Sequence, residues 1–107
     1  LQLEPRAGHL YVHFMGMAHL LAGDFETAVL RFKERIAASP ATDLSRGFMI
    51  SALGHLGRVE EAREVRQKLK EINPGYSFSE HVGRLPLQVP AALNMLLEGY
   101  KKADLKD

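Results

Sequence analysis

A stretch of this chain repeats itself after 34 residues, and this spacing constrains the fold more than any other feature. The same residue types return at matching positions of two successive units. They are Leu10, Phe14, Met15, Ala18, Gly23, Glu26, Ala28 and Pro40, and then Leu44, Phe48, Met49, Ala52, Gly57, Glu60, Ala62 and Pro74. A fixed period of this length predicts an array of stacked helical hairpins. Such arrays generally offer binding surfaces to other chains.

Length and composition predict one small folded domain, and the low charge argues against a nucleic-acid partner. The 107 residues are 46% hydrophobic, carry a formal net charge of +1 and include no cysteine. Nucleic-acid-binding domains usually present a basic face, which this balance does not provide. No apolar run approaches the ~20 residues that span a bilayer. We therefore expect no membrane insertion and a cytoplasmic location. Because the chain begins at Leu1, we expect a fragment of a longer protein.

The first unit reads as two helices. Pro5 suits a first helical turn, and Gly23 is expected to end that helix in the left-handed conformation. Asp24 is placed to cap the second helix, and Pro40 closes the unit. The predicted apolar face of the first helix consists of Leu10, Phe14, Met17, Ala18 and Leu21. That of the second consists of Ala28, Val29, Phe32 and Ile36.

The second unit follows the same plan, and the tail is less regular. Thr42 or Asp43 can cap a helix that Gly57 ends, and the cluster Asn73-Pro74-Gly75 breaks the next one. The predicted apolar positions of these two helices are Leu44, Phe48, Ile50, Leu53 and Leu56, and then Ala62, Val65, Leu69 and Ile72. Residues 76–84 predict a short helix, Pro86 an interruption, and Pro90 the first turn of a last helix. That last helix carries Leu93, Leu96, Leu97 and Tyr100 at helical spacing.

These units resemble the tetratricopeptide repeat family. In the first unit Ala28, Phe32 and Pro40 match the family's second helix and terminating proline, Met15-Gly16 its Leu-Gly pair, and Gly23 with Phe25 its turn between helices. The second unit keeps Gly57, Ala62, Leu69 and Pro74 but has Ile50 for the glycine and Arg66 for the aromatic residue. The resemblance implies an all-α, right-handed αα-hairpin solenoid in one domain, 1–107. Its repeats would be about 9–42 and 43–76, with an irregular third hairpin at about 77–104.

The same resemblance implies a concave groove lined by the first helix of each hairpin. The residues that would face it are Leu10, His13, Met17, Leu20, Leu44, Gly47, Ser51 and His55. Family members that grip a peptide's terminal carboxylate have Lys, Arg and Asn at such positions, and this chain has none there. An apolar groove with two histidines suits an amphipathic helix. It equally suits packing against the chain's own tail or against a second copy, and the sequence leaves these alternatives open.

The tail resembles something narrower. The segments Asn73-Pro74-Gly75-Tyr76, Arg84-Leu85-Pro86 and Leu96-Leu97-Glu98-Gly99-Tyr100 are similar to the C-terminal repeat segment of bacterial class III adenylate and guanylate cyclases. This resemblance implies that the chain is a regulatory part of a bacterial signalling protein, with the cyclase chemistry in another part of the parent.

No catalytic, cofactor or metal site is predicted. His9 and His13 stand four residues apart, but a zinc site needs three or four ligands and no cysteine is present. Glu60 and Glu61 are adjacent and point apart, so the charged run from Arg58 to Glu71 reads as a solvated helix face. We therefore expect a non-catalytic interaction domain that binds a protein or peptide segment, or another part of its parent chain. The alternative is a self-association module that completes its core as a homodimer.

Overall fold

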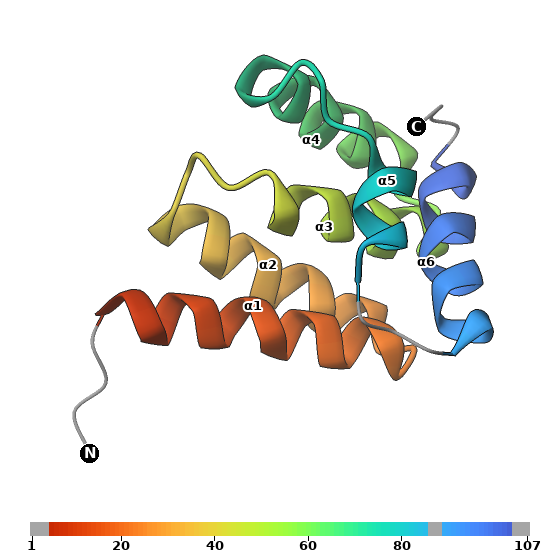
Figure 1. Ribbon diagram of the computed structural model, residues 1–107, viewed down its shortest axis with the longest axis horizontal. Coiled ribbons are helices and arrows are strands. Elements are labelled where there is room, and N and C mark those ends of the chain that lie inside the picture. Colours follow the sequence, from red (N-terminus) through yellow and green to blue (C-terminus); the bar gives the residue numbers. More distant parts are fainter. Residues whose placement is uncertain (1–4, 86–88, 104–107) are drawn as a thin grey trace.

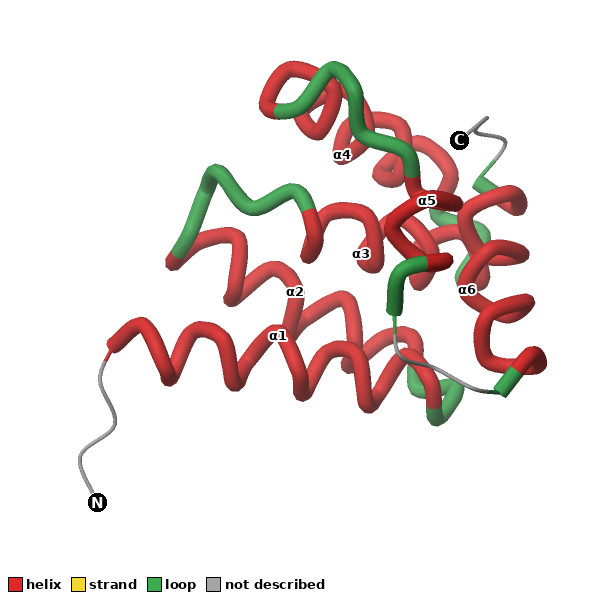
Figure 2. Tube along the Cα trace, in the orientation of Figure 1, coloured by secondary structure: helices red, strands yellow, loops and turns green. Residues whose placement is uncertain are grey.

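The structure, a computed structural model, describes residues 5–85 and 89–103. Within these ranges the chain forms six helices and no strand, and the predicted all-α class is confirmed. Where the structure describes the connections between helices, they are loops and turns (Figure 2). The helices are α1 (Pro5–Leu21), α2 (Phe25–Ala38), α3 (Leu44–His55), α4 (Val59–Ile72), α5 (Phe78–Gly83) and α6 (Pro90–Lys102).

The helix boundaries recur with the period of the sequence. The first and last residues of α2 and α4 are 34 positions apart, and so are the last residues of α1 and α3. Gly23 and Gly57 follow those two helices with positive φ angles of 83° and 74°. Only glycine adopts this conformation without a steric penalty, which is why both helices end where the sequence predicted.

Short polar side chains lie at the starts of α2 and α3. The Asp24 carboxylate accepts a hydrogen bond from the Thr27 amide, which confirms the predicted cap of α2. Asp43 occupies the cap position of α3 without a side-chain capping bond, and the Thr42 hydroxyl instead accepts from the Ser45 amide at 3.5 Å. The last helix begins at Pro90, as predicted. The interruption expected at Pro86 lies outside the described residues.

The first four helices pack in sequence, and the last two return to the middle of the array. α1 and α2 run antiparallel, α2 lies against α3, and α3 against α4 (Figure 1). α6 then packs mainly on α3, with α5 beside it. As a result, every residue of α3 from Ser45 to Gly54 is inaccessible to solvent or nearly so, whereas Leu44 at its start is exposed.

Aromatic and aliphatic side chains from all parts of the chain meet in one core. The predicted inner residues Ala28, Val29 and Phe32 of α2 are buried, as are Ala62 and Leu69 of α4. The core reaches into the tail, where Phe78 stacks on Tyr100 with ring centroids 4.4 Å apart. The tail therefore belongs to the same hydrophobic core as the two repeated units.

Most of the apolar face predicted for the first helix is exposed. Phe14 retains 55% of its exposure and Leu21 37%, whereas Leu20 is fully buried. The reason is that α1 is apolar around most of its circumference, so periodicity alone does not select its inner side. Helix α1 contacts α2 through Gly16, because a Cβ at this position would come within 2.7 Å of the Phe32 ring of α2.

Candidate functional site

The second half of the expected groove is covered by the chain itself. The Ser51 hydroxyl donates a hydrogen bond to the Leu96 carbonyl, and His55 Nε2 donates one to the Met95 carbonyl, both at 2.7 Å. Gly47 lies against the Tyr76 hydroxyl so closely that any Cβ would overlap it. On α3, therefore, these predicted groove residues contact the tail.

Two glycines make this coverage possible. Gly54 of α3 and Gly99 of α6 meet where the helices cross, and a Cβ at Gly54 would overlap the Gly99 carbonyl oxygen. A Cβ at Gly99 would in turn overlap the carbonyl of Ser51. Glycine at both positions lets the two backbones approach closely enough for the Ser51 and His55 hydrogen bonds to form.

The first half of the expected groove remains open as an apolar hollow of about 290 Å³. It lies between α1, α3 and the end of α5 and contains four of the predicted groove residues. The lining consists of Leu10, His13, Phe14, Met17, Leu44, Phe48, His81 and Leu85. Its volume is at the lower limit of small-molecule pockets, about 300 Å³, so it suits an anchoring side chain better than a cofactor.

The two histidines of the hollow are held in the neutral form. Burial, with smaller contributions from Arg35 and His81, lowers the pKa of His13 to about 4, and its Nδ1 lies 2.7 Å from the Ser45 hydroxyl. Burial also lowers the pKa of His81, although the Asp43 carboxylate opposes this shift. Near neutral pH both rings are therefore uncharged, and they line the hollow as aromatic surfaces.

The remaining predicted groove residue, Leu20, does not line the hollow, since it is completely buried in the core. Conversely, sequence reasoning missed Phe14, Phe48, His81 and Leu85 as lining residues. Phe14 could have been predicted, because it stands four residues after Leu10 and residues at this spacing share one face of a helix. No local signal marks His81 and Leu85, because they reach the hollow only through the return of the tail.

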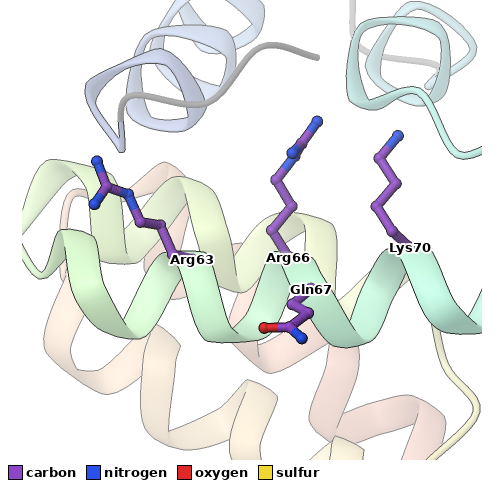
Figure 3. A pocket seen from close by; sticks show the side chains of 4 residues that line it. All are labelled: Arg63, Arg66, Gln67 and Lys70. Carbon is purple, nitrogen blue, oxygen red and sulfur yellow. The ribbon is translucent and has the colours of Figure 1, made fainter.

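A second hollow, of about 350 Å³, lies along α4 and has a basic lining (Figure 3). The side chains of Arg63, Arg66 and Lys70 extend from one side of that helix. Lys70 donates a hydrogen bond to the Tyr76 carbonyl at 2.9 Å, and Arg63 lies 3.5 Å from the Glu60 carboxylate. Arg63 and Lys70 therefore interact with groups of the same chain.

The described residues form neither a metal site nor a membrane-spanning helix. No group of three or more His, Cys, Asp or Glu side chains is arranged there to hold a metal ion. No helix in the same ranges combines the length and apolar character needed to cross a bilayer. His13, one half of the predicted histidine pair, is buried beside Ser45.

The chain was compared with protein-family models, curated proteins and solved structures. No protein-family model, no curated protein and no solved structure matches it.

Proposed function

We propose that the chain is a non-catalytic protein-interaction domain built as a tetratricopeptide-like, right-handed solenoid of helical hairpins. The recurrence of helix ends after 34 residues supports this arrangement. So do the paired positive-φ residues Gly23 and Gly57, and the paired buried residues Ala28 and Ala62. In this proposal α5 and α6 are the irregular third hairpin, which closes one half of the concave surface.

The open hollow is the observation that carries the proposed function. Leu10 and Leu44 at its rim retain 46% and 44% of their exposure, while Phe48 at its base is buried. An apolar recess with an exposed apolar rim is typical of sites that receive an anchoring side chain of another chain. The proposed partner is therefore a helical segment that inserts an apolar residue between α1 and α3.

The electrostatics of the hollow define the chemistry of that partner. The lining residues that the structure describes include no Asp, Glu, Lys or Arg, and the two histidines among them are neutral near pH 7. A charged anchor would lose its hydration there without gaining a counter-charge. We propose an uncharged apolar segment, from another protein or from the rest of the parent chain.

The biological setting of the proposal rests on the sequence resemblance. A domain of this kind in the cytoplasm of a bacterium would regulate the protein that carries it, and the tail segments favour a nucleotide cyclase as that parent. Such a domain would contribute binding and positioning, with the chemistry supplied elsewhere.

A synthetic amphipathic helix with a leucine-rich face and an uncharged polar face tests the hollow. We expect wild-type chain to bind this peptide in fluorescence anisotropy with micromolar affinity, about −8 kcal/mol. Leu44→Glu places a carboxylate at the rim and is expected to weaken binding at least tenfold. Leu44 suits this test better than Leu20, whose complete burial would make a glutamate there unfold the domain.

The matched control is Leu97→Glu on α6, a partly exposed leucine outside the hollow. This variant is expected to bind the peptide as wild type does, and circular dichroism should show equal helix content in all three proteins. Equal affinity of wild type and Leu44→Glu, or no binding by either, would contradict the proposed function.

A further inference from the structure

The outer side of α1 is an exposed apolar surface without charge. From Leu10 to Ala22 the chain contains no Asp, Glu, Lys or Arg. On the side away from α2, Tyr11 is 62% exposed, Phe14 55% and Leu21 37%, and Ala18 is also exposed. α1 lies along one edge of the molecule, with α2 and α3 on its inner side (Figure 1).

These residues have the spacing of a helix-pairing seam. Tyr11, Phe14, Ala18 and Leu21 follow one another at steps of three, four and three residues. Those steps are the a and d positions of a heptad, which form one stripe along a helix and bury it against a second helix. We call these four residues the α1 seam.

The exposed side of α4 has a different composition from this stripe. The exposed side of α4 carries Glu60, Arg63, Glu64 and Lys68, all of them charged. A helix with such a face is stable in water, whereas two exposed aromatic rings on one helix turn are costly to hydrate. The α1 seam therefore has the composition of a covered surface.

We infer that the α1 seam pairs with the α1 seam of a second copy in an antiparallel, two-fold symmetric dimer. Because the seam and its flanks contain no charge, self-pairing brings no like charges together. A different partner would gain no selectivity from flanking charges, which usually decide the pairing of helices.

Side-chain size favours the antiparallel orientation. In that orientation a positions face d positions, so Phe14 meets Ala18 of the second copy, and Tyr11 meets Leu21. Each large side chain then lies opposite a smaller one along a stripe roughly 15 Å long. Parallel pairing would set Phe14 against Phe14 and Ala18 against Ala18, leaving one layer crowded and the next one empty.

This dimer goes beyond the proposed binding function, and the two surfaces adjoin at Phe14. The hollow opens between α1 and α3, where His13 contacts Ser45, and it includes Phe14, whereas Tyr11, Ala18 and Leu21 of the α1 seam do not line it. Variants at Ala18 and at Leu44, which each belong to one surface only, therefore test the two surfaces separately.

Analytical ultracentrifugation of the whole chain over a concentration series tests the inference. A single helix pair buries less than the ~800 Å² per partner of a standard interface, so we expect dissociation in the micromolar range. Ala18→Glu should weaken the dimer at least tenfold, because two carboxylates would then enter the seam. Leu30→Glu is the matched control, since Leu30 is 55% exposed on α2, as Phe14 is on α1, and should leave the dimer unchanged.

Orientation is tested with thiol cross-linking, for which the absence of native cysteine is convenient. A short bis-maleimide should join Tyr11→Cys to Leu21→Cys in a mixture of the two variants, with much less product from either variant alone. A wild-type monomer at every concentration, or an Ala18→Glu dimer as stable as wild type, would overturn the inference. A monomeric wild type that still binds the helical peptide would refute the dimer alone, whereas a dimer that fails to bind the peptide would refute the hollow alone.

Discussion

His13 is the residue whose chemistry the fold changes most. A histidine on an apolar stretch would ordinarily be half protonated near pH 6.5. In the structure it is 95% removed from solvent, beside Ser45 and three aromatic rings. Its position in α1 puts it between the core and the hollow, so protonating it would place an unpaired charge in an apolar site.

The stability of the domain should therefore decrease in mild acid. Because burial lowers the pKa of His13 to about 4, the unfolded chain binds more protons than the folded one between about pH 6.5 and pH 4. Stability is complete above this window and is lost as the pH falls through it. By pH 5 we expect a loss of about 2 kcal/mol from this group, and His81, with its pKa also lowered, acts in the same direction.

Urea unfolding at pH 7.5 and pH 5 measures this loss. His13→Gln should reduce the difference in unfolding free energy between the two pH values, because it removes the group that takes up the proton. An identical pH dependence in wild type and His13→Gln would show that the burial of His13 has no energetic consequence.

At the scale of elements, the crossing of α3 and α6 determines which side of α3 is covered. The Gly54–Gly99 contact brings the helices together, and the Ser51 and His55 hydrogen bonds hold α6 in register. Without this crossing the inner side of α3 would be open, as the repeat pattern suggested. The tail therefore covers this side of α3, and the hollow beside α1 is left open.

Gly99→Ala should release α6 from α3. The added Cβ would overlap the Ser51 carbonyl and the His55 ring, and we expect a destabilisation of roughly 3 kcal/mol despite the better helix propensity of alanine. Gly83→Ala is the control, because a Cβ there meets nothing within 4 Å. Thermal unfolding by circular dichroism compares the two, and equal melting temperatures would contradict the tight crossing.

At the scale of the whole molecule, α3 is the centre about which the other helices are arranged. Its neighbours include α2, α4 and α6, and the radius of gyration of 13.0 Å is that of a compact domain of this length. A helix enclosed in this way exchanges its amide protons only when much of the surrounding structure opens.

Hydrogen exchange followed by mass spectrometry should therefore find the slowest amides in α3. The amides of α4, which packs on α3 alone among the larger contacts, should exchange faster. Exchange of α3 at the rate of α4 would indicate that the tail does not hold the domain together. In the Gly99→Ala variant the exchange rates of α3 and α4 should be more similar, because α6 would pack less tightly on α3.

Local signals predicted the elements closely. Gly23, Gly57, Asp24 and Pro90 act through their own backbone conformation or capping bond, and each ends or begins a helix as predicted. The inner face of α2 was also predictable, because polar residues such as Lys33 and Glu34 mark its outer side. α1 lacks such residues, so its inner face could not be read from its pattern.

The sequence by itself determined an all-helical chain with a 34-residue repeat, since helix propensity, glycine conformation and capping act over a few neighbouring residues. The tertiary structure alone decided that α6 covers Ser51 and His55, that Leu20 is internal and that Phe14 is exposed. These outcomes depend on contacts between residues far apart in the chain, such as Gly54 with Gly99 and Gly16 with Phe32. Steric fit at such contacts exists only once the helices are packed, and it selects which apolar side chains become core and which remain surface.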